Sequence, residues 1–419
     1  MRTKTASAIN KDILLIGVLF FVFGFVTWLG SVLIPYLKIA CQLSTFESYL
    51  VAFSFYISYT VMALPAAWVL RITGSKKGMA LGLFIMGIGA LIFIPAATTR
   101  WYALFLVGLF IQGAGLTILQ SASNPYITKL GDPESAATRI SIMGICNGIA
   151  GVIAPLLLGA VILSDAEAID KSLLVLSDAE KNAALNVLAS RVILPYAIIM
   201  IVLVLLALLI YYSTLPALDT DEEDGAVSAA NENKKNIFQF PHLLLGAITL
   251  FLYVGVEVIA VDTIFGFAVS QGVSLSNAKF FTSLTILNML AGYIVGISCI
   301  PRFIKQEKAL KFSAVAGIIF TFAAIVSQGI TAVIFISLLG LANALVWPSI
   351  WPLAIKGLGR FTKTGSSLLI MAIGGGAILP LLYGRLAETF SPHNAYWVIL
   401  PCYLFILYYS MKAHKLRSK

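Results

Sequence analysis

The chain has 419 residues, of which 59% are hydrophobic and 11% are charged, and it carries a formal net charge of +9 at pH 7. Soluble domains contain about 25% charged residues, so the composition excludes a soluble globular protein and indicates a polytopic membrane protein. The basic balance does not indicate a nucleic-acid partner, because the distribution of the charges along the chain has a membrane explanation.

Apolar segments long enough to cross a bilayer, which takes about 20 residues, follow one another along the chain. The first begins near Asp12 and has no small-residue cleavage site behind it, so we expect a retained span rather than a signal peptide. Twelve spans are predicted, at roughly 12–37, 46–70, 78–97, 102–128, 138–163, 192–215, 242–269, 278–300, 311–328, 331–355, 364–385 and 394–412.

Lysine and arginine residues fall mainly in alternate loops of this topology. With a cytoplasmic N-terminus, 21 of the 28 basic residues lie on the cytoplasmic side. The seven on the outer side are Lys38, Arg100, Lys171, Lys181, Arg191, Lys279 and Arg385. The positive-inside rule therefore predicts that both termini are cytoplasmic.

Two long connections divide the chain. Residues 164–190, on the outer side, carry leucines among polar residues, which predicts short amphipathic helices. Residues 219–236 are acidic, then small and polar, then basic, which is typical of a linker. We therefore predict an N-terminal six-helix bundle at 1–216, a cytoplasmic linker at 217–240 and a C-terminal six-helix bundle at 241–419.

The two halves share weak sequence matches at a near-constant offset. Gly24 aligns with Gly255 at an offset of 231, Asn124-Pro125 with Trp351-Pro352 at 227, and Ala154-Pro155 with Leu379-Pro380 at 225. A repeated six-span unit joined by a cytoplasmic linker is the plan of the major facilitator fold. In this all-α membrane fold, two pseudo-symmetric six-helix bundles rock about a central site.

The fourth span contains an unusual polar cluster within an apolar run. Thr117, Gln120 and Asn124 fall within about 60° of one another on one helical face, and Pro125 removes a backbone donor. Polar groups at that depth should face a bundle interior or a water-filled cavity. One amide alone would favour a packing role between helices, but the cluster with Pro125 favours a solute pathway.

Two carboxylates, Glu257 and Asp262, lie inside the seventh span. An ionisable group at mid-membrane indicates function, although a structural hydrogen bond to a neighbouring helix is the alternative. Five residues apart, they point about 140° apart on a regular helix, unless the helix breaks at Gly255 or Gly266. Glu257, which shares a face with Tyr253, is the favoured coupling group. By contrast, the carboxylate in residues 44–47 (STFE) fits a capping box at the start of the second span.

Further amides and aromatic rings lie in the spans. They are Asn147, Asn288, Asn343, Trp28, Tyr56, Trp347 and Trp351. Amides bond hydroxyl groups and flat rings cover C–H patches, a combination that suits a sugar. The spacing of Asn343, Trp347 and Trp351 predicts a common helical stripe, although such a stripe also fits packing or an interfacial belt. No lysine or arginine lies mid-span, so we expect a neutral solute rather than an anion.

The four cysteines are scattered and the three histidines do not cluster, so we expect no metal site. An enzyme would need a His/Asp/Ser, metal or paired-carboxylate constellation, and none is evident. A sensor would need an appended soluble domain, for which the loops are too short. Transport is therefore the favoured function class.

Several segments resemble the fucose–galactose–glucose:cation symporters of the major facilitator superfamily, especially their glucose/galactose branch. The resemblance rests on residues 33–38 (LIPYLK), residues 119–125 (LQSASNP), Asn147, residues 253–258 (YVGVEV), and residues 374–376 (GGG) followed by Pro380. It implies inward symport of a hexose with H⁺ or Na⁺. It also implies that Asn147 contacts the sugar and that Gln120 occupies the place of a Glu or Gln of the family.

The first span departs from this family pattern. The family has Asn-Asp before its Leu-Ile-Pro motif, and that aspartate serves coupling and binding, whereas this chain has Gly30-Ser31. Since Gln120 is also neutral, coupling through the first span is in question. Under the internal repeat, Asp262 is the counterpart of Ser31, so we infer that the acidic role has moved to the seventh span.

These observations predict a secondary active transporter that imports a neutral monosaccharide by cation symport with alternating access. The sugar would be a hexose such as glucose or galactose, or a fucose-like sugar. An uncoupled sugar facilitator, or a carrier of another neutral polyol or amino sugar, is the alternative. We expect a monomeric protein of the bacterial inner membrane that has no cofactor, no nucleic-acid partner, and Na⁺ or H⁺ as coupling ion.

The predicted site has two groups of residues. The expected substrate-binding residues are Gln120, Asn124, Asn147, Trp28, Ser31, Tyr56, Asn288, Asn343 and Trp347. The expected cation-coupling residues are Glu257 and Asp262.

Overall fold

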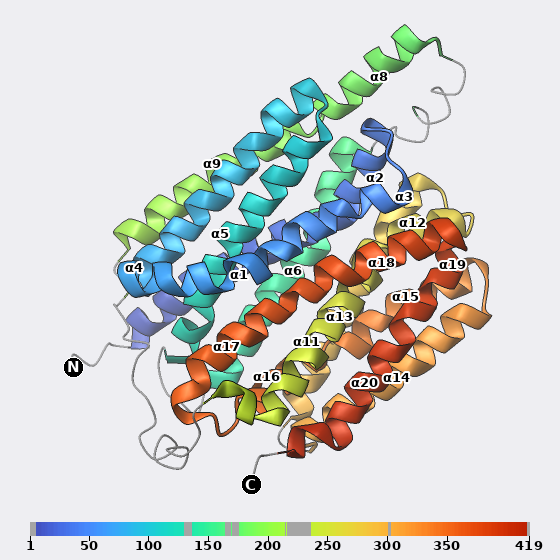
Figure 1. The fold of residues 1–419 in the computed structure, drawn as a ribbon. Helices are drawn as coiled ribbons and strands as arrows, with labels where there is room; N and C mark the ends of the chain where they lie inside the picture. The colour runs from blue at the N-terminus through green and yellow to red at the C-terminus, as the bar shows by residue number, and fades with distance from the viewer. Residues whose placement is uncertain are drawn as a thin grey trace.

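The computed structural model describes residues 6–129, 136–163, 169, 176–213, 215, 236–300 and 303–416. Nearly all of these residues are helical, and no strand occurs among them. Most of the predicted linker at 217–240 lies outside the described residues. Figure 1 shows the first half of the chain, in blue to green, beside the second half, in yellow to red.

The described residues of the first half form seven long helices and one short helix. They are α1 (Ala6–Trp28), α2 (Gly30–Ala40), α3 (Thr45–Ser48), α4 (Leu50–Thr99), α5 (Tyr102–Lys129), α6 (Ala136–Ile162), α8 (Asp178–Ser190) and α9 (Ile193–Tyr212). The capping box predicted at the start of the second span is confirmed: Ser44 and Glu47 each accept a hydrogen bond from the other's backbone N–H, at the N-terminus of α3.

The second half has shorter and more interrupted helices. The α-helices are α11 (Pro241–Asp262), α12 (Ile264–Ser270), α13 (Leu275–Cys299), α14 (Gln306–Val326), α15 (Gly329–Asn343), α16 (Val346–Ile355), α17 (Thr362–Met371), α18 (Gly375–Thr389), α19 (Pro392–Ala395) and α20 (Ile399–Met411). Short 3₁₀ turns are η2 (Ile237–Gln239), η3 (Gly359–Phe361), η4 (Ala372–Gly374), η5 (Tyr396–Val398) and η6 (Ala413–Lys415).

Helix α4 contains two membrane spans. It has 50 residues, and a straight helix of that length would extend about 75 Å, more than twice the thickness of the hydrocarbon core. Gly74 interrupts it with φ 72° and ψ 169°, a left-handed conformation that favours glycine, and the chain folds back there. The described residues contain 11 apolar helical segments long enough to cross a membrane, and counting both arms of α4 gives the twelve predicted spans.

Equivalent spans of the two halves are broken near the same level. The first span divides into α1 and α2 at Leu29, and the seventh divides into α11 and α12 at Thr263. The sequence indicated that Gly255 and Gly266 would permit a break of the seventh span, and the observed break at Thr263 lies between them. A methyl group at Gly255 would lie 2.2 Å from Cδ1 of Leu379, so this glycine allows α11 and α18 to approach closely.

The amphipathic segment predicted after the fifth span is confirmed in its described part. In α8, Leu185 and Leu188 are buried, and the Tyr36 hydroxyl on α2 donates to the carbonyls of Leu188 and Ala189 at 2.8 and 2.9 Å. Helix α8 therefore packs directly on the first span.

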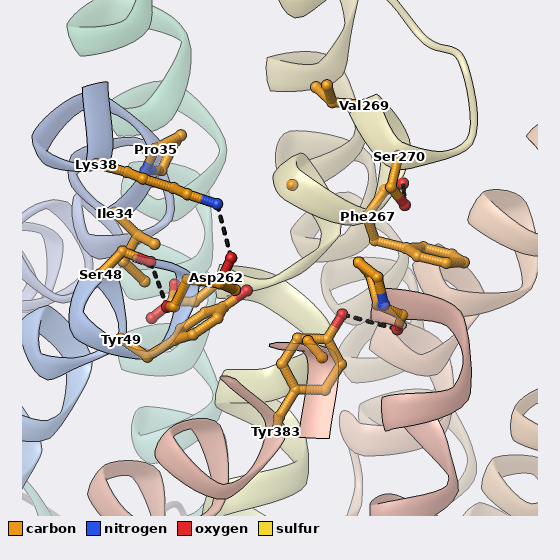
Figure 2. Close-up of a pocket in the computed structure, with 14 residues that line it drawn as sticks. Ile34, Pro35, Lys38, Ser48, Tyr49, Asp262, Phe267, Val269, Ser270 and Tyr383 are labelled. Carbon is orange, nitrogen blue, oxygen red and sulfur yellow. Dashed lines mark hydrogen bonds between the residues drawn. The ribbon is translucent and has the colours of Figure 1, made fainter. Parts of the chain in front are cut away.

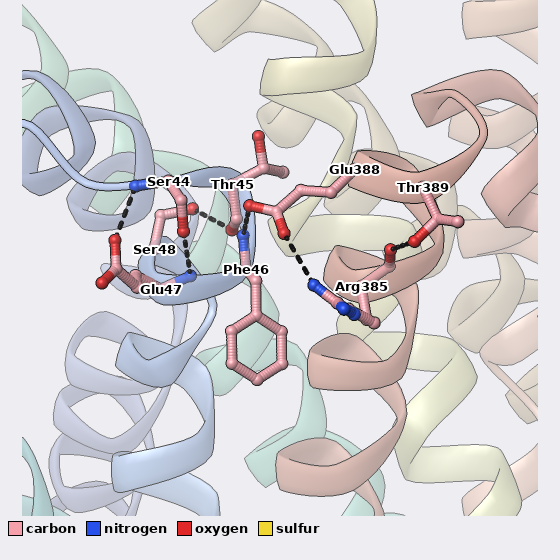
Figure 3. Close-up of polar contacts among 8 residues, drawn as sticks. All are labelled: Ser44, Thr45, Phe46, Glu47, Ser48, Arg385, Glu388 and Thr389. Atoms are coloured by element: carbon pink, nitrogen blue, oxygen red, sulfur yellow. Dashed lines mark hydrogen bonds and ion pairs between the residues drawn. The ribbon is translucent and has the colours of Figure 1, made fainter.

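The two halves close tightly against each other at the end where α3, α12, α18 and α19 meet (Figure 1). There the Phe46 N–H donates to Oε1 of Glu388 at 2.7 Å (Figure 3). The rings of Tyr49 and Tyr383 pack edge to face with centroids 5.6 Å apart. Deeper in the molecule, the Thr60 hydroxyl donates to the Met371 carbonyl at 2.9 Å. We call the Phe46–Glu388 end the closed end.

Candidate functional site

Asp262 lies between the halves, at the C-terminus of α11. Its side chain is only 2% exposed, and Oδ1 is buried without a hydrogen-bond partner among the described residues. A methyl group at Gly30 of α2 would lie 3.2 Å from Oδ2 of Asp262 and 3.7 Å from Oδ1. The carboxyl group of the seventh span therefore packs against the first span, beside Ser31. Ser31 itself is buried and donates to the carbonyl of Trp28 at 2.9 Å.

A cavity of about 230 Å³ at the closed end borders Asp262 (Figure 2). Lys38 of α2 also lines it, and its ammonium donates to the Thr45 hydroxyl at 2.8 Å. Tyr49 and Tyr383 form part of the wall, one from each half. Asp262 is thus placed where a cavity, the ammonium group of Lys38 and both halves of the molecule meet.

Glu257 faces a different space from Asp262. Every residue from 253 to 265 is buried except Glu257, which is half-buried. Because buried neighbours surround it on all sides of α11, its accessible surface faces an internal space of the bundle rather than lipid. Oε1 of Glu257 accepts a hydrogen bond from the Tyr253 hydroxyl at 2.8 Å, in agreement with the prediction that these two residues share a helical face. No described residue forms a hydrogen bond with Oε2 of Glu257.

Three of the predicted amides are available for a solute. Gln120 and Asn124 on α5, and Asn147 on α6, are half-buried, and their side chains make no hydrogen bond to another described residue. Thr117, the third polar residue on this face of α5, is not available in the same way, because its hydroxyl donates to the Gly113 carbonyl at 2.8 Å. The side chain of Pro125 lies outside the described residues.

Two of the predicted aromatic rings are buried between helices. Trp28 packs so closely on α6 that a methyl group at Gly151 would lie 2.4 Å from its Cδ1, and its indole Nε1 is buried without a partner. Tyr56 is 5% exposed, and its ring lies 2.9 Å from the position of a methyl group at Gly376. In this closed arrangement both rings lie at contacts between helices.

The stripe predicted for Asn343, Trp347 and Trp351 is interrupted. Helix α15 ends at Asn343 and α16 begins at Val346, so the regular spacing does not continue across the break. Trp347 and Trp351 remain stacked, with centroids 5.5 Å apart, and are half-buried. Asn343 is 1% exposed, and its Oδ1 accepts from the Tyr403 hydroxyl at 2.8 Å.

Asn288 on α13 is also engaged within the second half. Its Nδ2 donates to both the carbonyl and the hydroxyl oxygen of Ser337, each at 3.2 Å. The amides available for a solute therefore come from the first half, while Glu257 and the tryptophan pair of α16 come from the second.

Sequence reasoning missed the tyrosines and the lysine around Asp262. Tyr49 and Tyr383 line the cavity that borders it, one from each half. Lys38 shares the cavity with Asp262. One signal was available: Lys38 is among the few basic residues on the predicted outer side and follows the Leu-Ile-Pro motif of the first span. The tyrosines lie in distant spans, and no local pattern connects them to Asp262.

No group of three or more metal-ligating side chains occurs in the described part of the chain. The site is instead a set of amides, rings and two separated carboxyl groups. Such a set can bind a neutral polar molecule through hydroxyl groups and can hold a proton, because each carboxyl oxygen accepts or donates according to its protonation state.

Known proteins resemble this chain over nearly its whole length. The family profile described as Major Facilitator Superfamily matches residues 16–380. A glucose/galactose transporter of Brucella abortus biovar 1 (strain 9-941) is 35% identical over 420 residues, which cover 99% of this chain and 97% of that protein. An L-fucose-proton symporter of Escherichia coli (strain K12) is 29% identical over 407 residues, which cover 93% of this chain and 92% of that protein. A crystal structure of the transporter FucP in the outward conformation matches with a TM-score of 0.73 and 28% identity, covering 95% of this chain and 97% of that one.

Proposed function

This chain belongs to the major facilitator superfamily, and we propose that it imports a neutral monosaccharide together with a proton by alternating access. It is a multi-pass membrane transporter rather than an enzyme. Relatives that match over nearly their whole length are named for glucose/galactose and L-fucose–proton transport. A hexose or a fucose-like sugar is therefore the substrate class that the whole-chain similarity supports.

The available side chains support a sugar as the solute. The free amides of Gln120, Asn124 and Asn147 can bond sugar hydroxyls as donors and acceptors. The stacked Trp347 and Trp351 rings offer an apolar surface to C–H groups from the other half. A sugar held between the halves in this way would draw them together, which is the requirement of alternating access.

The observation that carries the coupling proposal is the burial of Asp262 between the halves against Gly30. An ionised carboxylate buried without a partner is costly, so the closed end favours the protonated form of Asp262. When the closed end opens, the cavity that Asp262 and Lys38 line would join the solution outside, and Asp262 could exchange its proton with water. Proton occupancy would then change the balance between the two states, as uphill transport requires.

Glu257 serves as the second acid in this proposal. It lies deeper along α11 than Asp262 and faces the internal space rather than the closed-end cavity. By the positive-inside rule, the closed end is the outer one, the termini are cytoplasmic, and the internal space opens toward the cytoplasm. The protein would therefore take up protons near Asp262 and release them on the side that Glu257 faces.

The function can be tested with purified protein in proteoliposomes under separately imposed H⁺ and Na⁺ gradients. We expect accumulation of glucose, galactose or fucose above the equilibrium level with an inward H⁺ gradient, and not with an Na⁺ gradient alone. Equilibration without accumulation under either gradient would indicate the uncoupled facilitator. Uptake of sorbitol or glucosamine but of no hexose would overturn the substrate class, and accumulation with Na⁺ alone would overturn the proton.

A further inference from the structure

The tryptophan pair that we assign to the sugar follows a helix break. Helix α15 ends at Asn343 and α16 begins at Val346. Trp347 and Trp351 both lie on α16, so the bend between the two helices decides where their rings point. Pro348 permits the bend, because it has no N–H to donate to the carbonyl of the residue four positions earlier. A helix with a missing hydrogen bond can bend to different degrees, so packing around the break has to select one geometry.

Helix α13 packs closely against the break. A methyl group at Gly292 would lie 2.5 Å from Cβ of Ala344, and one at Gly296 would overlap Cδ2 of Leu345. The two residues of the break are therefore seated on a part of α13 that lacks side chains. Apolar contacts of this kind are non-directional, so they hold the break against α13 without fixing its rotation.

A directional contact reaches the break from α20. The Tyr403 hydroxyl donates to Oδ1 of Asn343 at 2.8 Å, and the two residues are 0% and 1% exposed. The ring of Tyr403 is held in turn by α14, because a methyl group at Gly317 would overlap its Cε1 atom. A buried hydrogen bond, which has a strong angular preference, therefore joins the last residue of α15 to a ring fixed between α14 and α20.

Resting on the sugar import proposed above, we propose that Tyr403 is a positioning residue of the sugar site. Through Asn343 it fixes the bend between α15 and α16, and the bend directs the rings of Trp347 and Trp351 toward the sugar. Neither Tyr403 nor Asn343 contacts the sugar in this arrangement, because both side chains are enclosed by helices. The amide of Asn343, which the sequence predicted as a sugar ligand, thus acts on the sugar through the tryptophan pair.

A fixed bend lowers the cost of sugar binding. Rings that are already in place need not be ordered when the sugar arrives, and a ring contributes only where its face meets the C–H groups. Loss of the Tyr403 hydrogen bond would leave the break seated on the glycines of α13 but would let α16 rotate. We therefore expect the affinity for sugar to fall while the two halves still exchange sugar.

The test substitutes Tyr403→Phe, which keeps the ring against Gly317 and removes only the hydroxyl. Purified variants are placed in proteoliposomes, and counterflow exchange of labelled glucose, galactose or fucose is measured over a range of sugar concentrations. The half-saturating concentration should rise about 3- to 10-fold, as expected for a ring contact that is partly lost, while the maximal rate of exchange is retained. A variant that only misfolds would instead lower the maximal rate.

The matched control is Tyr409→Phe, on the same helix as Tyr403. Tyr409 is also 0% exposed, but its hydroxyl donates at 3.2 Å to the carbonyl of His242 on α11 rather than to α15. This variant should keep the wild-type half-saturating concentration. An unchanged value in Tyr403→Phe, or an equal rise in both variants, would overturn the positioning role.

A double variant separates positioning from stability. Removing one partner of a buried hydrogen bond leaves the other unsatisfied, whereas replacing both by apolar groups of similar shape can restore stability. Asn343→Leu combined with Tyr403→Phe should therefore recover thermal stability but keep the raised half-saturating concentration. Recovery of both together would show that the hydrogen bond serves folding alone and would overturn the proposal. This comparison decides the matter even where Tyr403→Phe by itself does not fold.

A measurement without sugar distinguishes the positioning role from sugar import. Acrylamide quenching of fluorescence is compared between each protein and its counterpart that carries Trp347→Phe and Trp351→Phe, and the difference reports the tryptophan pair. Tyr403→Phe should expose the pair to stronger quenching, and Tyr409→Phe should not. Quenching of the pair in Tyr403→Phe as in the wild type would overturn the positioning role. Absence of saturable hexose exchange in wild-type vesicles would overturn sugar import, while the quenching still decides whether Tyr403 positions the pair.

Discussion

Gly30 and Asp262 come from opposite halves of the molecule, and the backbone of one is packed against the carboxyl group of the other. A methyl group at Gly30 would lie 3.2 Å from Oδ2 of Asp262, which is closer than most methyl contacts in proteins. The carboxyl group in the seventh span thus reaches the part of the first span where the resembling family has its own acidic residue. This contact supports our inference that Asp262 has taken over that acidic role.

Gly30→Ala should therefore weaken coupling more than it weakens sugar exchange. The added methyl group must displace the Asp262 carboxyl group or shift α2 by a few tenths of an ångström, which disturbs the protonatable site while leaving the amides of α5 in place. We expect concentrative uptake to fall by about 5- to 30-fold, corresponding to about 1–2 kcal/mol of strain, with counterflow less affected. Gly266→Ala is the control, since nothing lies within 4 Å of a methyl group there. Equal losses in both variants would contradict the role of the contact.

Gln120→Ala and Asn147→Ala should each weaken sugar binding. The amides make no hydrogen bond within the described protein, so removing either leaves sugar hydroxyls unpaired in a desolvated site at a cost of about 1–3 kcal/mol. Isothermal titration or counterflow half-saturation would measure the loss. Asn288→Ala is an informative comparison, because that amide already bonds Ser337. Unchanged affinity in both of the first two variants, with folding confirmed, would place the sugar elsewhere.

Glu388→Ala should favour opening of the closed end. The hydrogen bond from the Phe46 N–H to Glu388 joins α3 to α18, and a carboxylate at this partly exposed position stabilises the contact by about 0.5–1.5 kcal/mol. Labelling of a cysteine at Ala387, which lines the cavity, should quicken about 2- to 10-fold. Glu388→Gln keeps an acceptor oxygen and should show a smaller change. No change in labelling for Glu388→Ala would mean that the rings of Tyr49 and Tyr383 suffice to hold this end shut.

The predicted topology can be tested by labelling cysteines from outside intact cells. The linker is expected to be cytoplasmic and α8 periplasmic, so an impermeant reagent should modify a cysteine at Glu180 but not one at Gly225. The reverse pattern would invert the assignment of the closed end as the outer end.

The sequence was sufficient for the architecture, because span length, charge asymmetry and capping are local properties. The twelve spans, the capping box at Ser44 and the amphipathic α8 all follow from residues that lie close together in the chain. Even the bend of α4 between the second and third spans coincides with the short polar stretch around Gly74.

The contacts of the candidate site could not be predicted in the same way, because they join distant spans. Nothing in the sequence shows that Asp262 packs on Gly30, that Tyr56 rests on Gly376, or that Lys38 shares a cavity with Asp262. The tryptophan stripe is wrong for a different reason: the helix breaks after Asn343, and the direction of the side chains changes there. Pro348 marks this break in the sequence, because it has no N–H to donate to the carbonyl of Ala344 four residues earlier. That Glu257 is the favoured coupling group remains a prediction. The contact between the two halves is made by the other acid, Asp262.

The most direct test of proton symport through Asp262 is sugar accumulation by Asp262→Asn in proteoliposomes with an imposed inward H⁺ gradient. An asparagine is neutral at every pH and nearly the same shape, so it can remain buried against Gly30 while it can no longer gain or lose a proton. We predict that Asp262→Asn exchanges sugar in counterflow but does not accumulate it, at any external pH between about 5 and 8, where the wild type accumulates more as the external pH falls. Accumulation by Asp262→Asn to the wild-type level, with the wild-type dependence on external pH, would contradict the proposed coupling.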